Sequence, residues 1–185
     1  MFQVYGLPLA GGAAVVVLLL VWLVYRRRTA VQREINSALR AVSRASLRDI
    51  VIPDVVNEQI HLDYLLLTPK GLLVLDLRDM PGVVFAGDNL EEWTLLDGHE
   101  RFGFTNPLGP LRAKIESVKS LVTQVPVHGR VAFTARASFP KGKPDLVTSL
   151  PELVEEFGWE KDSAAEKSLD AFHLGWERVK RAALN

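Results

Sequence analysis

Two carboxylates, Asp63 and Asp76, stand in otherwise apolar stretches of this sequence and are the first candidates for chemistry. A carboxylate inside a strand is disfavoured, so each needs a compensating partner. If the two acids face each other on neighbouring strands, their like charges repel. A divalent cation bound between them reverses the sign of that interaction. Arg78, two residues after Asp76, can neutralise negative charge but cannot act as a base, because its guanidinium stays protonated.

The elements that position the two acids are two predicted strands, residues 59–67 and 72–77, joined by the turn sequence Thr-Pro-Lys-Gly at 68–71. If only the proline and the lysine form the loop, Asp63 faces Asp76. If the glycine adds a bulge, the register shifts by one residue and the acids point to opposite faces of the sheet. The sequence leaves both registers open.

These residues resemble the core of the NERD (nuclease-related) domain. The resemblance rests on Asp63, on the Asp-Leu-Arg at 76–78 after the turn, and on Gly82. It extends to Trp93 and to the Asn-Pro-Leu at 106–108, and we expect it to cover residues 34–157. The resemblance implies a restriction-endonuclease-like fold and a metal-dependent nuclease.

The resemblance also implies roles for individual residues. Asp63 and Asp76 would be catalytic and would bind Mg²⁺ or Mn²⁺, which prefer oxygen ligands. Arg78 stands where the family has a lysine, and would orient water and neutralise charge. Glu34, on the first predicted helix, matches an acid that helps to hold the metal. The alternative for Glu34 is a surface residue paired with a neighbouring arginine.

Three departures from the family pattern bear on activity. Arg78 replaces the lysine, Asp76 replaces a longer glutamate, and Pro110 stands where a glutamine is usual. Two functions therefore remain open. One is an active nuclease that cleaves nucleic acid. The other is a catalytically degenerate domain that binds nucleic acid or a protein partner.

The N-terminal sequence predicts a single-pass membrane anchor over residues 1–28. Residues 1–25 carry no charge, residues 7–25 are almost wholly apolar, and about 20 such residues span a bilayer as a helix. Arg26, Arg27 and Arg28 follow at once, which places the C-terminal part in the cytoplasm and favours contact with anionic lipid. A cleaved signal peptide is the alternative, but it usually carries its positive charge at the other end.

Composition limits the other possibilities. Lys plus Arg and Asp plus Glu both number 22, so the net charge of zero provides no global attraction to nucleic acid. The chain has no cysteine, which excludes disulfides and thiolate metal sites. Any metal ligands must be oxygen atoms or imidazole nitrogens.

The remaining pattern predicts an α/β domain over residues 29–160 and a C-terminal helix within 161–185. Helices at 30–47 and 108–125 would flank a mixed sheet of about five or six strands. We expect an edge strand at 49–56 and a polar loop at 98–103. Lys114 and Lys119 are expected on the solvated face of the second helix.

Overall fold

The structure is a computed structural model of the chain, and it describes residues 7–54 and 58–183. The chain divides into two compact units, Met1–Asn36 and Ser37–Asn185. Helix α1 (Leu7–Val42) forms the described part of the first unit, and its last turns belong to the second.

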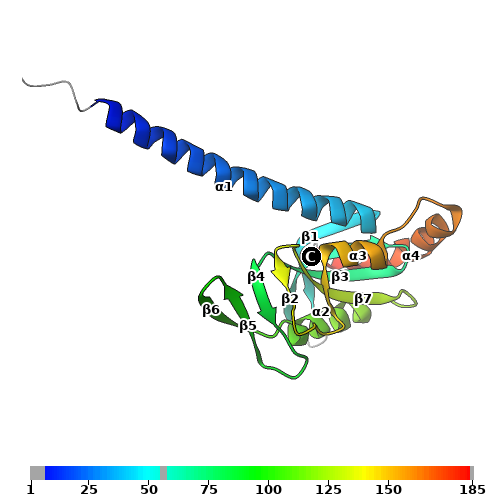
Figure 1. Cartoon of the computed structure of the whole chain (residues 1–185). Coiled ribbons are helices and arrows are strands. Elements are labelled where there is room, and N and C mark those ends of the chain that lie inside the picture. Colours follow the sequence, from blue (N-terminus) through cyan, green and yellow to red (C-terminus); the bar gives the residue numbers. More distant parts are fainter. Residues whose placement is uncertain (1–6, 55–57, 184–185) are drawn as a thin grey trace, which may run out of the picture. The chain divides into compact units, whose positions relative to one another are not determined.

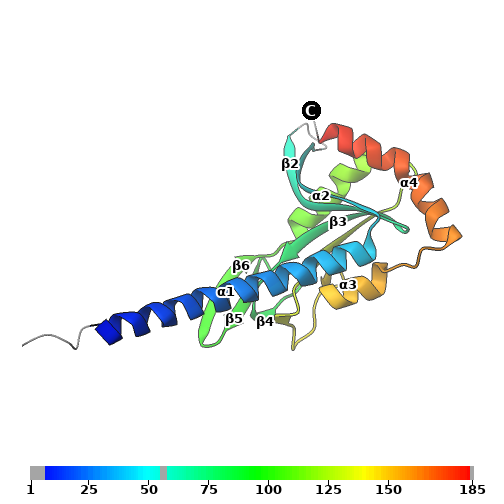
Figure 2. The same cartoon turned by 90° about the horizontal axis from the view of Figure 1, so that it is seen from above.

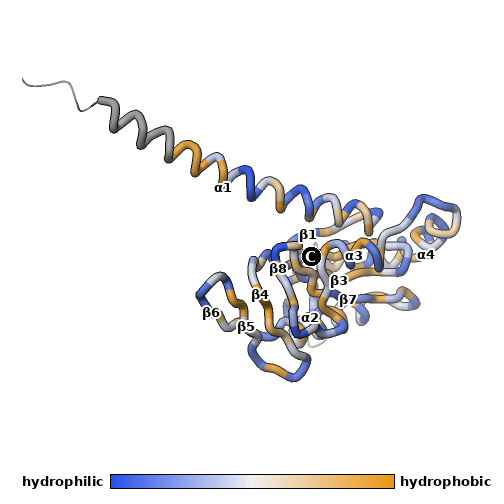
Figure 3. Tube along the Cα trace, in the orientation of Figure 1, coloured by the Kyte–Doolittle hydropathy of each residue, from blue (hydrophilic) through white to orange (hydrophobic). Residues whose placement is uncertain are grey.

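Helix α1 changes character along its length. Residues 17–23 are apolar, and arginines follow from Arg26 onward (Figure 3). Among the residues that the structure describes, no helix is both long and apolar enough to cross a membrane. Residues 1–6 of the predicted anchor lie outside the described residues, and for residues 7–16 and 24 only the backbone is described. The membrane anchor therefore stays a prediction.

The predicted helix at 30–47 is too long at its C-terminal end, because α1 ends at Val42 and strand β1 (Ala45–Pro53) begins three residues later. The N–H of Arg44 donates to the carbonyl of Leu67, and Ala45 is paired with Leu67. Backbone pairing with the neighbouring strand thus outweighs the helical periodicity that continues to residue 47.

The central sheet has five strands, and the prediction of a mixed sheet is confirmed. β1 lies at its edge, as expected from Pro53, and the first three strands are antiparallel. The last three are parallel, so the chain crosses over between β3 and β7. The order is β1, β2 (Gln59–Thr68), β3 (Gly71–Arg78), β7 (Val127–Phe133) and β9 (Val147–Ser149).

A second sheet is formed by three strands between β3 and the crossover helix α2 (Leu108–Leu121) and by one short strand after β7 (Figure 1). The expected polar loop at 98–103 is wrong, because most of this segment belongs to strand β6, where Phe102 pairs with Leu95 and Phe104 with Trp93. The sheet has the order β6 (Glu100–Thr105), β5 (Glu92–Asp97), β4 (Gly82–Phe85) and β8 (Ala137–Ser138).

Helices α2 (Leu108–Leu121) and α4 (Ser163–Ala182) contact each other and strands β1 to β3 (Figure 2). They share one hydrophobic core with the central sheet. Leu111, Ile115 and Val118 of α2 belong to this core together with Leu65 and Val74 of the hairpin. The apolar stripe of α2 is therefore what fixes this helix against the strands that carry the two acids.

The turn between β2 and β3 sets the hairpin register. Thr68 is paired with Gly71, so only Pro69 and Lys70 form the loop, and no bulge is present. Gly71 has φ +126°, and a Cβ atom there would lie 2.2 Å from the carbonyl oxygen of Pro126. Glycine is thus required both by the backbone conformation and by the close approach of the chain before β7.

Helix α3 (Leu150–Phe157) follows β9 directly and begins with a capping box. The Ser149 hydroxyl accepts from the N–H of Glu152, and the Glu152 carboxylate accepts from the N–H of Ser149. The Lys143 ammonium also donates to this carboxylate. The hydrogen bond from Lys143, followed by that from the Ser149 backbone, lowers the pKa of Glu152 from 4.5 to about 2.

Candidate functional site

The hairpin register brings Asp63 and Asp76 to one face of the sheet. Leu65 pairs with Val74, and both side chains lie in the core beneath α2. Side chains two residues away in a strand point to the same face, both two residues before Leu65 and two residues after Val74. These residues are Asp63 and Asp76, and both carboxylates lie within 4 Å of the ammonium of Lys114 on α2. Of the two registers that the sequence left open, the structure has the one that joins the acids.

Lys114 is the central contact of the site. Its Nζ is 2.6 Å from Oδ1 of Asp76 and 3.9 Å from Oδ1 of Asp63. The Lys114 side chain is 12% exposed and that of Asp76 is 1% exposed. The expected solvated position of Lys114 is therefore wrong. Lys114 follows the buried Leu111 by three residues, which places it on the inward face of α2, and this spacing was the signal that sequence reasoning overlooked.

The Asn-Pro sequence before α2 fixes the position of this helix, and its hydrogen bonds do not involve the two acids. The Asn106 side-chain amide donates to the carbonyls of Gly87, Asp88 and Leu90, and its Oδ1 accepts from the N–H of Leu108. Asn106 thereby ties the first turn of α2 to the β4–β5 turn. The fully buried Trp93 reinforces this turn, because its indole N–H donates to the same Gly87 carbonyl.

One oxygen of the site lacks a partner. Oδ2 of Asp76 is buried and makes no hydrogen bond in the structure. A buried carboxylate oxygen in this state carries a desolvation cost, and a cation would relieve it. Among the residues that the structure describes, no group of three or more His, Asp or Glu side chains is arranged to hold a metal ion. Two carboxylates still fit Mg²⁺ or Mn²⁺, because Mg²⁺ commonly takes one or two carboxylates and keeps several waters.

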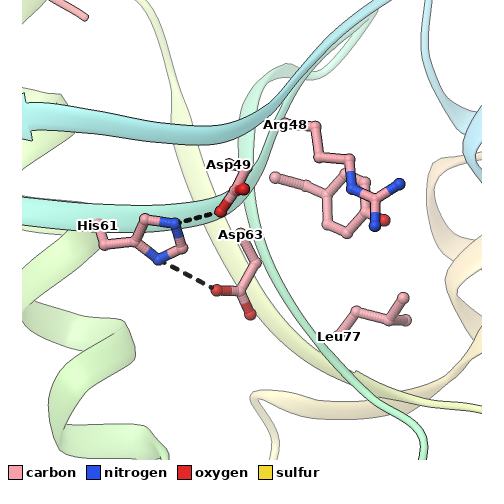
Figure 4. A pocket seen from close by; sticks show the side chains of 6 residues that line it. Arg48, Asp49, His61, Asp63 and Leu77 are labelled. Carbon is pink, nitrogen blue, oxygen red and sulfur yellow. Dashed lines mark hydrogen bonds and ion pairs between the residues drawn. The ribbon is translucent and has the colours of Figure 1, made fainter.

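A shallow pocket opens beside Asp63, and Figure 4 shows its side chains. His61 lies between two acids, with Nε2 2.6 Å from Oδ1 of Asp49 and Nδ1 3.6 Å from Oδ1 of Asp63. Asp49 has φ +58°, which is uncommon for a residue with a side chain. Sequence reasoning assigned Asp49 no role. The strand pattern gave no signal for it, because its contact with His61 depends on this local conformation of β1.

Arg78 does not contact the acid pair. Its side chain is exposed, and among the described residues it forms no ion pair. Asp63 instead lies beside His61, and Asp76 is paired with Lys114. The catalytic role of Arg78 stays a prediction.

Glu34 lies on α1 in the first unit, whereas the acid pair lies in the second. Its role as a metal ligand stays a prediction. The structure thus unites two of the expected ligands, Asp63 and Asp76, through a lysine that was not expected.

The family model of the nuclease-related domain matches residues 26–134, which is more than half of the chain. The chain therefore belongs to the nuclease-related domain family, as the resemblance suggested. The match starts and ends earlier than the expected 34–157, so α3 and α4 lie outside it. No curated protein and no solved structure matches the chain.

Proposed function

We propose that this domain cleaves phosphodiester bonds of nucleic acid in a reaction that depends on Mg²⁺ or Mn²⁺. The observation that carries this proposal is the buried Oδ2 of Asp76, which lacks a partner, on a carboxylate that shares Lys114 with Asp63 in a member of the nuclease-related domain family. An oxygen of this kind is suited to bind a cation.

The roles of the residues follow from their positions. Asp76 is held in place by burial, and Asp63, whose side chain is 31% exposed, faces solvent and substrate. Together they would hold the metal and orient the water molecules around it. When bound, the divalent cation activates a water molecule and neutralises charge at the phosphate. Arg78 is exposed two residues beyond Asp76, where it is available to bind a phosphate.

A second pocket supports nucleic acid as the substrate. It is lined by apolar side chains, by Thr94, by Arg101 and by Lys141, and among the described residues no carboxylate lines it. The Lys141 ammonium lies 5.3 Å from the ring centre of Phe85. Proteins that bind single-stranded nucleic acid use cationic side chains to contact the phosphates and aromatic side chains to stack on the bases. Although the net charge of the chain is zero, these two cations give this pocket a local positive charge that can attract phosphates.

We also propose that the chain is held at the cytoplasmic face of a membrane by its N-terminal segment. The support is the uncharged sequence 1–25 followed by Arg26, Arg27 and Arg28. Residues 17–23 are all apolar and exposed. The three arginines would contact anionic lipid.

The test of the proposed activity uses the full chain in a mild detergent. Labelled single- and double-stranded DNA and RNA are incubated with Mn²⁺, with Mg²⁺ or with EDTA. We expect cleavage with metal, none with EDTA, and a loss of at least 100-fold in Asp76→Asn and in Asp63→Asn. The matched control is Asp88→Asn, which removes an exposed acid of the same domain. Cleavage that persists in EDTA or in both site variants would refute the proposal.

The alternative is a degenerate domain that binds nucleic acid or a protein at the membrane without cleaving. The ion pair between Lys114 and Asp76 favours it, because this pair already balances the buried charge without metal. The same assay separates the two functions. Binding of labelled strands with no cleavage under any metal condition would support the alternative.

A further inference from the structure

The Lys114 ammonium lies within 4 Å of both expected metal ligands, Asp63 and Asp76. It contacts Oδ1 of Asp76 and approaches Oδ1 of Asp63, so one cation already serves both acids. We propose that Lys114 is an internal cation that competes with a divalent metal ion for Asp63 and Asp76, and thereby sets the metal affinity of the site. This inference rests on the proposed function only in taking these two acids as the metal ligands.

Burial gives the ammonium its influence. In the ion pairs of the described residues, Lys114 is the least exposed cation at 12%, followed by Arg130 at 18%. Charges in such surroundings are screened less by water and salt than charges at the surface. Removing or adding one positive charge here therefore changes the site far more than at Lys119 on the same helix, which is 49% exposed.

The two oxygens of Asp76 show where the competition takes place. Oδ1 accepts from Lys114, whereas Oδ2 has no partner. A metal ion on Oδ2 would lie on the same carboxylate as the ammonium, so the two positive charges repel. The lysine ammonium is carried on a flexible four-carbon chain, so it can move away from the carboxylate when a cation with a higher charge binds.

The test is calorimetric titration of Mn²⁺ into the full chain in detergent. Lys114→Gln keeps a hydrogen-bond donor for Asp76 and removes the charge. Lys114→Arg keeps the charge, and Lys119→Gln is the matched control on the exposed face of α2. We expect Lys114→Gln to bind Mn²⁺ at least tenfold more tightly than the native chain. Lys114→Arg and Lys119→Gln should stay within about threefold of it. Adding Asp63→Asn and Asp76→Asn to Lys114→Gln should abolish binding.

A merely structural lysine predicts the opposite sign, because its loss would disorder the acids and weaken metal binding. Unchanged or weaker affinity in Lys114→Gln, or no binding in any variant, therefore overturns the inference. If Lys114→Gln is unfolded without metal, Mn²⁺ should restore a cooperative thermal transition, and failure to do so overturns it as well.

The outcomes also separate this inference from the proposed activity. Tighter metal binding in Lys114→Gln with no cleavage by the native chain would support Lys114 as a competitor and refute the nuclease. Cleavage by the native chain with unchanged metal affinity in Lys114→Gln would support the nuclease and refute the competitor.

Discussion

Replacing Asp76 by asparagine should destabilise the domain when no metal is present. From the sequence alone the opposite is expected, because two acids that face each other repel and removing one charge relieves that repulsion. The structure reverses this sign. Asp76 is the 2.6 Å partner of a lysine that is largely buried, so the substitution leaves the ammonium without its main counter-charge.

The magnitude follows from burial and distance. Two unit charges at this separation attract by roughly 6 kcal/mol at an effective dielectric constant of about 20. Breaking a buried pair by removing one partner typically costs about 3–5 kcal/mol. Asp63 remains 3.9 Å from the ammonium and offers it a second, more exposed partner. We therefore expect a loss near the lower end, about 3 kcal/mol.

Urea unfolding of the full chain in detergent, with EDTA present, measures this loss through the fluorescence of tryptophans such as the fully buried Trp93. Asp63→Asn is the matched comparison. Its carboxylate is more exposed and farther from Lys114, so its loss should cost less than about 1 kcal/mol. The double variant Asp76→Asn with Lys114→Gln should recover much of the stability, because it removes both buried charges.

A loss below about 1 kcal/mol in Asp76→Asn, or a gain in stability, would refute this reasoning. It would mean that the repulsion between the two acids outweighs the attraction of each to Lys114. An equal loss in both single variants would show that the ammonium is shared evenly, contrary to the two distances.

Two further predictions concern the elements around the site. Glu152→Gln should lower stability by about 1 kcal/mol at pH 7, because glutamine can still accept from the Ser149 N–H but removes the charge that pairs with Lys143, a pair that solvent screens since Glu152 is 46% exposed. Because its pKa in the folded state is lowered to about 2, the contribution is present above pH 4.5 and is lost as the pH falls through 2, so the unfolding midpoints of variant and native chain should converge in acid. Asn106→Ala should cost about 2 kcal/mol in a thermal unfolding assay, because it deprives three carbonyls and the N–H of Leu108 of a partner; a loss of a few tenths would show that water replaces the amide.

The hairpin shows what could be predicted from this sequence. The two strands, the turn and the positions of the acids could all be predicted, because apolar runs and a Pro-Lys-Gly turn reflect local conformational preferences. The register was not, because both options satisfy those preferences. It is decided by Gly71, whose missing side chain lets the carbonyl of Pro126 approach, a contact between residues 55 positions apart. Long-range packing of this kind leaves no local pattern.

The same limit explains the errors at β1 and β6. Residues 43–47 continue a helical pattern, yet the backbone N–H of Arg44 bonds to Leu67 on a neighbouring strand. Residues 98–103 were expected to form a polar loop, yet residues 100–105 pair with β5 and carry Phe102 and Phe104. In both segments a partner strand, rather than the segment itself, determines the conformation.

The site itself combines two acids that were expected from the sequence with a lysine that was overlooked. The family pattern places its lysine at the position of Arg78, and that position is exposed here. A lysine nevertheless lies against the acid pair, and it comes from α2. Asn106 makes this possible, because it fixes the start of the helix two turns before Lys114. Counting motif positions along β3 alone therefore predicts a site without a lysine. In the folded domain the lysine comes from α2, and the start of α2 is fixed by Asn106, which belongs to the same family motif.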